Sequence, residues 1–253
     1  MFTDSGQVFD DARLSAVEVH LLDLNTDDHL DAHVVYYGQP GVPDKVYLND
    51  GQAIFSDSGL SLAENTIAWG DLDGDGDVDY FGKSWGVGYV VQINNSSGGF
   101  SASWQMADPL ATIGGIGLAD FDGDGDLDAL VANGFREIGS QPSRLFWNDG
   151  SGQFTDSGLL LNETLGADLA LGDLDLDGDP DVVIANMDRP NEIWLFHEGS
   201  FIDSCLRLGQ NSDMSSMPTL GDLDGDGDLD IIFGRFNGGV EIWFNFTING
   251  VNP

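Results

Sequence analysis

The sequence predicts an all-β protein built from five repeats. A nine-residue acidic stretch recurs as "DLNTDDHLD" (23–31), "DLDGDGDVD" (71–79), "DFDGDGDLD" (120–128), "DLDLDGDPD" (173–181) and "DLDGDGDLD" (222–230). The first aspartates of these stretches lie 48, 49, 53 and 49 residues apart, and such a fixed period marks a repeat architecture. Runs of β-branched and aromatic residues, such as "DVVIA" and "DIIFG", follow the stretches and predict strands.

Each repeat divides into four short strands. In the third repeat we expect them at 115–121, 128–133, 144–149 and 152–160, with the acidic stretch between the first and the second. The turn between the third and fourth strands recurs as "NDGQAIF", "NNSSGGF", "NDGSGQF" and "HEGSF", and Asn, Asp and Gly suit a hairpin there. Four strands per repeat are what a propeller blade requires.

The composition is strongly acidic. Eight Lys and Arg against 44 Asp and Glu give a net charge of −36, and the five stretches hold 24 of those acids. Because more than half of the acidic residues belong to the repeated stretches and 41% of all residues are hydrophobic, we expect a folded chain rather than a disordered one. The negative charge should repel nucleic acid. The single Cys205 excludes an internal disulfide framework, and no segment has the apolar length of a membrane span.

The acidic stretches predict calcium sites. Ca²⁺ accepts six to eight oxygen ligands, so carboxylates at positions 1, 3 and 5, a carbonyl at position 7 and a closing carboxylate at position 9 can surround one ion, with glycine at position 6 for the turn. Up to five ions, one per repeat, are expected. The expected metal-binding residues are Asp23, Asn25, Asp27, His29 and Asp31; Asp71, Asp73, Asp75, Asp77 and Asp79; Asp120, Asp122, Asp124, Asp126 and Asp128; Asp173, Asp175, Asp177, Asp179 and Asp181; and Asp222, Asp224, Asp226, Asp228 and Asp230.

Other metal-binding motifs fit less well. An EF-hand needs glutamate at position 12, which holds Val34, Gly82, Val131, Ile184 and Phe233 in the five stretches. The calcium-binding nonapeptide of parallel β-helices repeats every nine residues rather than every fifty. Zinc prefers His or Cys, and Mg²⁺ keeps more water than these loops allow.

The pattern DxDGDGxxD between two strands, at about fifty residues, resembles the FG-GAP or VCBS repeat of calcium-binding β-propellers, including the integrin α-chain head. The resemblance covers nearly the whole chain. It implies a single domain, 1–253, that forms a five-bladed β-propeller of four-stranded antiparallel blades, with repeats at about 12–60, 61–106, 107–161, 162–209 and 210–253 plus 1–11. The first stretch departs most, with Asn25, Asp28 and His29 in place of Asp, Gly and Asp.

The two ends predict how the ring closes. "MFTDSG" at the start matches "QFTDSG" at 153–158, a fourth strand, whereas the last repeat ends on its third strand. We therefore expect residues 1–11 to complete the last blade, which removes two open sheet edges. A fragment of a larger ring is the competing interpretation.

Ligand binding is expected on the face opposite the acidic stretches. Six of the basic residues fall in the expected connections between second and third strands on that face: Lys45, Lys83, Arg136, Arg144, Arg189 and Arg235. Aromatic and thioether side chains recur there, and such groups suit sugar stacking or a protein contact. The candidate ligand-binding residues are Tyr37, Trp85, Phe135, Arg136, Met187, Arg235 and Phe236. The competing interpretation is that these side chains only fill blade tips and the central channel.

Catalysis finds little support in the sequence. The four histidines form no triad with Ser and Asp, and Cys205, Trp147, Trp194 and Trp243 on strand patterns are expected in the core. We expect a non-catalytic, extracellular, monomeric recognition module that binds a carbohydrate or a protein partner, with no nucleic acid partner and no membrane insertion. The alternative is a carbohydrate-active enzyme of propeller type, such as a polysaccharide lyase.

Overall fold

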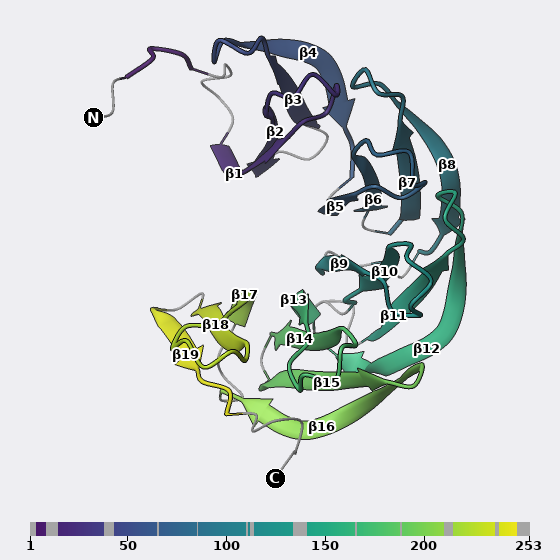
Figure 1. The fold of residues 1–253 in the computed structure, drawn as a ribbon, viewed down its shortest axis with the longest axis vertical. Coiled ribbons are helices and arrows are strands. Elements are labelled where there is room, and N and C mark those ends of the chain that lie inside the picture. Colours follow the sequence, from purple (N-terminus) through teal and green to yellow (C-terminus); the bar gives the residue numbers. More distant parts are fainter. Residues whose placement is uncertain are drawn as a thin grey trace.

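The computed structural model describes residues 4–8, 15–37, 43–64, 66–84, 86–109, 111, 114–133, 141–164, 166–187, 189–209, 215–235 and 238–246. Every regular element in these residues is a β-strand. The strands form five separate antiparallel sheets that are arranged around a centre as the blades of a propeller (Figure 1). The expected all-β, five-bladed architecture is confirmed.

The blades follow the chain in order. The first holds β1 (Ser15–Leu22), β2 (Asp31–Tyr37), β3 (Asp44–Asn49) and β4 (Phe55–Leu62). The second holds β5 (Thr66–Gly70), β6 (Asp79–Ser84), β7 (Gly88–Asn94) and β8 (Phe100–Ala107). The third holds β9 (Ile116–Ala119), β10 (Asp128–Val131), β11 (Gln141–Asn148) and β12 (Phe154–Thr164). The fourth holds β13 (Gly166–Gly172), β14 (Asp181–Asn186), β15 (Asn191–His197) and β16 (Ser200–Leu208), and the fifth holds β17 (Ser215–Gly221), β18 (Asp230–Arg235) and β19 (Val240–Trp243).

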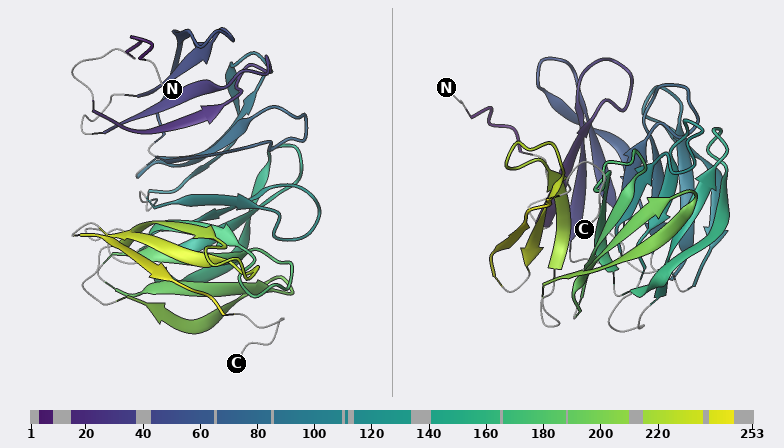
Figure 2. Two further views of the ribbon diagram at one scale, coloured as in Figure 1. Left: turned by 60° about the vertical axis from the view of Figure 1, so that its left-hand side comes forward. Right: turned by 60° about the horizontal axis from the view of Figure 1, so that its bottom comes forward.

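Each blade is a simple meander. Consecutive strands pair, and the first strand of each blade lies nearest the centre of the ring (Figure 1). The second strand has a neighbour on both sides, and all six residues of β14, "DVVIAN", are buried. β-branched residues suit such a strand because both of its faces pack against side chains. The strands run between two faces of the molecule, so the connections lie on one face or the other (Figure 2).

The core lies between neighbouring blades. Phe81 and Tyr89 of the second blade pack against Phe146 of the third, with ring centroids 5.9 and 5.2 Å from it. Close approach also needs a small residue on an inner strand. A Cβ at Gly117 would lie 2.6 Å from the Cδ1 atoms of Leu169 and Leu171 in the next blade, so a larger residue there would require these leucine side chains to shift.

The ring is interrupted between the first and fifth blades (Figure 1). Within the described residues, the fifth blade has three strands, and the side chain of Gln7 hydrogen bonds to Ala53 and Phe55 of the first blade. Completion of the last blade by residues 1–11 therefore stays a prediction. Trp194 is buried, but the expectation of a core position for Trp243 is wrong: it is 37% exposed, and β19 is the last strand of its sheet among the described residues.

Candidate metal sites

The five acidic stretches form the connections between first and second strands, and we name them loop 1 (23–31), loop 2 (71–79), loop 3 (120–128), loop 4 (173–181) and loop 5 (222–230). Each loop wraps around its first aspartate. In loop 2, Gly74 N donates to Asp71 Oδ1 at 2.8 Å and Gly76 N donates to Asp71 Oδ2 at 3.0 Å. Loops 3 and 5 repeat both bonds, and in loops 1 and 4 the donors are the amides of positions 5 and 6.

This wrapping requires left-handed backbone conformations at positions 4 and 6. Gly74 and Gly76 adopt φ of +76° and +92°, which glycine does without strain. Loop 1 places Thr26 and Asp28 there, at +57° and +66°, and loop 4 places Leu176 at +64°. The sequence motif pointed to position 6 only, so the second strained position was missed.

The closing aspartate of each loop is a buried clamp. Asp31, Asp79, Asp128, Asp181 and Asp230 are all 0% exposed. One oxygen accepts the amide N–H of loop position 2, and the other accepts the amide N–H at the end of the third strand; for Asp79 the donors are Leu72 and Asn94, both at 2.8 Å. The same pair of bonds recurs in the other four blades. This carboxylate therefore fixes the acidic loop against the hairpin beside it.

Burial changes the acidity of these clamps. Desolvation raises the pKa of Asp79, Asp128 and Asp181 to about 6, against the lowering effect of the two amide donors on each. Burial also raises the pKa of Asp31. A nearby cation would favour the ionised form of each group, which the protein alone disfavours.

Carboxylate oxygens converge in four of the loops. Ligand atoms lie within 4.8 Å of one another in the groups Asp71, Asp73 and Asp79; Asp120, Asp122 and Asp124; Asp173, Asp175 and Asp181; and Asp222, Asp224 and Asp230. Oxygens bound to one Ca²⁺ at about 2.3 to 2.6 Å can be no further apart than about 5 Å. Both carboxylate oxygens of Asp77 are also buried and have no hydrogen-bond partner among the described residues. The donor set therefore fits a hard cation.

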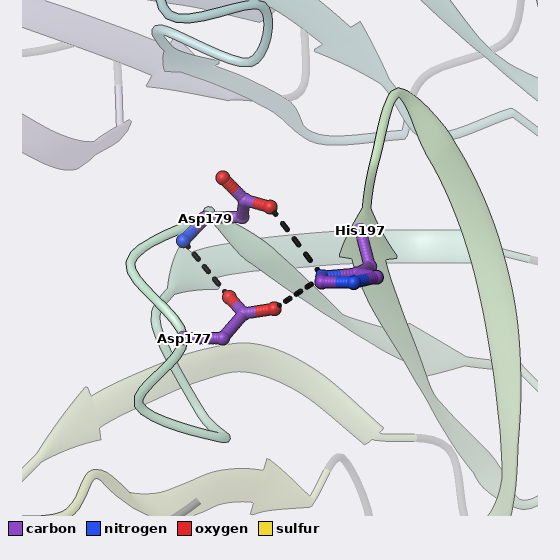
Figure 3. A group of neighbouring side chains, drawn as sticks. All are labelled: Asp177, Asp179 and His197. Carbon is purple, nitrogen blue, oxygen red and sulfur yellow. Dashed lines mark hydrogen bonds and ion pairs between the residues drawn. The ribbon is translucent and has the colours of Figure 1, made fainter.

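Loop 4 carries an additional imidazole. Nδ1 of His197, at the end of β15, lies 2.7 Å from Oδ2 of Asp177 and 3.8 Å from Oδ2 of Asp179 (Figure 3). The hydrogen bond to Asp177 raises the pKa of His197. Loop 1 has a similar contact, 3.1 Å between His29 Nδ1 and Asp27 Oδ1. The predicted hairpin "HEGSF" contains His197. Because the hairpin and loop 4 lie on the same face of a blade, the sequence could have suggested the contact between His197 and Asp177.

A second feature missed from the sequence is a set of asparagines that link blades. Asn148, at the end of β11, donates one amide hydrogen bond to Leu127 O of its own loop and one to Leu72 O of the previous blade, at 3.2 and 2.9 Å. Asn94 donates to Leu24 O and Asn245 to Leu174 O in the same way. The turn sequences "NDGSGQF" and "NNSSGGF" contain Asn148 and Asn94, but only the ring arrangement reveals their partners in the previous blade.

The structure corrects the expected basic face. Lys83 lies in β6, is 0% exposed and donates from Nζ to Ala132 O at 2.9 Å, because its strand is covered by the next blade. Desolvation lowers the pKa of Lys83 to about 7. Lys45, Arg144 and Arg235 form ion pairs with acidic side chains, Arg235 with Glu241 at 3.1 Å. Cys205 was expected to be buried, but it is exposed on the outer strand β16.

The candidate ligand-binding residues are only partly visible. Tyr37 ends β2, Arg235 ends β18 and the half-buried Met187 follows β14, at ends of strands opposite the acidic loops. Trp85, Phe135, Arg136 and Phe236, and the side chain of Tyr37, lie outside the described residues.

The comparison with protein-family models agrees with the repeat geometry. A model of the FG-GAP-like repeat matches residues 71–131, 120–184 and 173–233. No curated protein matches. Among solved structures, the V. cholerae biofilm matrix protein Bap1 is similar with a TM-score of 0.46 and 19% identity over 87% of this chain and 34% of that chain, so this chain spans about a third of it. BBS1N, solved in complex with ARL6DN, is similar with a TM-score of 0.47 and 11% identity over 89% of this chain and 76% of that chain.

The family match and the structure describe the same unit. Each matched segment begins at the first aspartate of an acidic loop and extends through the next loop into the strand that follows it. No helix among the described residues is long and apolar enough to cross a membrane. Because the repeat matches overlap and together cover more than half of the sequence, the chain belongs to the FG-GAP-like repeat family.

Proposed function

We propose that this propeller binds Ca²⁺ through its acidic loops, with up to five ions, and acts as a non-catalytic recognition module. The observation that carries the calcium proposal is the repeated convergence of carboxylate oxygens in loops 2 to 5, around a backbone turn that all five loops share. Oxygen-only ligand sets of this kind suit Ca²⁺, which accepts flexible cages of six to eight oxygens.

An extracellular location fits this chemistry. Acidic loops in extracellular modules typically bind calcium with dissociation constants of about 10⁻⁴ to 10⁻³ M, a range matched to calcium outside cells. Such loops would stay largely empty at cytosolic concentrations. We therefore place the working protein outside the cell or at its surface, as a monomer.

A neutral carbohydrate is the leading ligand class, and a protein surface is the second. The net charge of −36 repels anionic ligands, and the basic side chains Lys45, Arg144, Arg207 and Arg235 are held by acidic partners. Aromatic side chains suit stacking on sugar rings at little electrostatic cost, and in the sequence they recur shortly after the second strand of a repeat. Candidate contacts are Tyr37, Trp85, Phe135, Met187 and Phe236.

A glycan array probed with the calcium-loaded protein tests this proposal. Selective binding to a glycan class is expected, and replacement of Trp85 by Ala should weaken it at least tenfold while leaving the melting temperature unchanged. Trp147→Ala is the matched control, since Trp147 packs against the core of the third and fourth blades and its loss should reduce stability. An array with no glycan bound would favour a protein partner, and time-dependent release of products from a polysaccharide would overturn the non-catalytic assignment.

A further inference from the structure

A cavity of about 280 Å³ lies where the inner strands of four blades meet. Its polar lining comes from Glu18 and His20 of β1, His33 of β2, Asp44 of β3, Thr66 of β5 and Asp168 of β13. None of these residues belongs to an acidic loop. The cavity is therefore a second polar site, distinct from the proposed calcium sites. The first strands that contribute to it, β1, β5, β9 and β13, lie nearest the centre of the ring (Figure 1).

Two histidines face each other in this cavity. His20 and His33 are direct partners in the β1–β2 register, and their rings stack with centroids 5.4 Å apart. His33 is 1% exposed, and neither of its ring nitrogens has a hydrogen-bond partner among the described residues. A buried polar group without a hydrogen bond destabilises a protein. Among the described residues the ring nitrogens of His33 have only the ion-pair contact of Nε2 with Asp44, so they have unused capacity for a ligand.

A carboxylate stands beside each ring. Nε2 of His20 lies 3.5 Å from Glu18 Oε1, and Nε2 of His33 lies 3.4 Å from Asp44 Oδ2. Two ligands bound at about 2.0 to 2.1 Å to one tetrahedral ion lie about 3.4 Å apart. Each histidine and its carboxylate therefore already have the separation of two ligands of the same metal.

The cavity is lined by three carboxylates, Glu18, Asp44 and Asp168, so its charge favours a bound cation. No lysine or arginine is among the described residues that line it. Asp168 interacts electrostatically with the buried Lys83. Gly115 leaves space for the Asp168 carboxylate, because a Cβ at Gly115 would lie 2.2 Å from Asp168 Oδ1. Glu18 and Asp44 contact the two histidines, and Asp44 Oδ1 also accepts the amide N–H of Tyr36 at 3.0 Å, which fixes the Asp44 carboxylate in place.

We propose that this cavity binds one divalent transition-metal ion of the zinc type, with His20 and His33 as nitrogen ligands and Glu18 and Asp44 as oxygen ligands. Imidazole and carboxylate together suit Zn²⁺ far better than Ca²⁺, which takes oxygen alone. The rings are stacked rather than converged on one point. Binding therefore requires rotation of His20, whose side chain is 33% exposed and has the freedom that the buried His33 lacks.

Zinc titration of the full chain in excess calcium tests the proposal, because calcium then occupies any site that prefers oxygen. Calorimetry should show one tight zinc equivalent, and Co²⁺ in its place should give the strong visible absorption of a low-coordinate, nitrogen-bound ion. H20Q and H33Q should each weaken zinc binding at least tenfold. H29Q and H197Q are the matched controls: both remove a histidine that contacts an acidic loop, and both should leave zinc binding unchanged.

Folding is checked by thermal melting in calcium. If H33Q fails to fold, H20Q decides the test, because His20 is less buried. Loss of the zinc equivalent in H197Q rather than in H20Q would overturn the proposal and move the metal to Asp177 and Asp179. The absence of any zinc binding tighter than millimolar would overturn it as well. Either result leaves the calcium proposal standing, because calcium binding is measured separately.

Discussion

Leu176 shows how a single residue limits a loop. It takes the fourth position of loop 4 with φ of +64°, where loops 2, 3 and 5 have glycine, and its side chain is 45% exposed. A branched side chain in the left-handed region costs roughly 1 to 2 kcal/mol, and this side chain recovers little of that by burial.

Leu176→Gly should therefore stabilise the protein. We expect the free energy of unfolding to rise by about 1 kcal/mol relative to Leu176→Ala, which keeps the Cβ and the strain. Urea unfolding of both variants in calcium measures the difference. If the alanine variant were as stable as the glycine variant, strain at this position would not limit the loop.

The buried clamps predict an unusual pH dependence for the metal-free protein. The pKa values of Asp79, Asp128 and Asp181 are raised to about 6, above the ordinary value of an aspartate. A carboxyl group with a raised folded-state pKa binds protons more tightly when folded, so stability falls as pH rises from about 4 through about 6.

Without metal, the melting temperature should therefore be higher near pH 5 than near pH 7. Calcium binds the ionised carboxylates, so saturating calcium should remove or reverse this trend. Calorimetry at both pH values, in chelator and in calcium, checks the sign. A metal-free melting temperature that falls on acidification would contradict buried clamps of raised pKa.

At the scale of elements, the asparagine links predict how the ring closes. The side-chain amide of Asn148 donates both to Leu127 O in its own loop and to Leu72 O in the previous blade. Among the described residues the side-chain amide of Asn49 donates only to Leu30 O of its own loop. Leu223 has the same position in loop 5 as Leu72 has in loop 2. By analogy with Asn148, the side-chain amide of Asn49 would donate its second hydrogen bond to Leu223 O of the last blade.

If the ring closes as the sequence predicts, Asn49→Ala should destabilise the protein as much as Asn148→Ala, by about 1 to 3 kcal/mol. Both variants lose the hydrogen bond from the asparagine to the acidic loop of its own blade. The difference between their free energies of unfolding therefore reports the hydrogen bond between blades. Urea unfolding gives both values. A much smaller loss for Asn49→Ala would mean that the first and fifth blades remain apart.

The loops should not bind calcium equally. Loop 1 has Asn25 in place of an aspartate and Asp28 at φ of +66° in place of glycine, and its carboxylates form no converged group among the described residues. It should fill last, because it lacks one charge and its turn is strained. Crystals at limiting calcium should show loops 2, 3 and 5 occupied before loop 1; full occupancy at Asp23 with an empty site at Asp71 would reverse this ranking.

Local patterns predicted the strands and loops, whereas contacts between blades escaped prediction. The strands of the third repeat and the acidic loops depend on β-branched runs and aspartate spacing, which are visible within ten residues. The burial of Lys83, the second bond of Asn148 and the exposure of Trp243 depend on which blade lies alongside. The facing pair His20 and His33 follows from strand register, which the sequence did not fix.

At the scale of the whole molecule, charge is the dominant feature. A net charge of −36 favours expansion of the chain, and loops 1 to 5 concentrate much of this charge at the ends of the inner strands. The core between blades opposes that expansion. Cations bound to the loops would neutralise the repulsion where it is strongest, so metal binding and folding should be coupled.

Thermal unfolding with and without calcium tests this account most directly. At calcium tenfold to a hundredfold above the dissociation constant, each bound ion adds about 1.4 to 2.7 kcal/mol to the free energy of unfolding, so the melting temperature should rise strongly above that in chelator. Magnesium at equal ionic strength is the control for screening, and it should have a much smaller effect. Identical melting curves in calcium and in chelator, from protein shown to be metal-free, would contradict the proposal that the acidic loops are calcium sites.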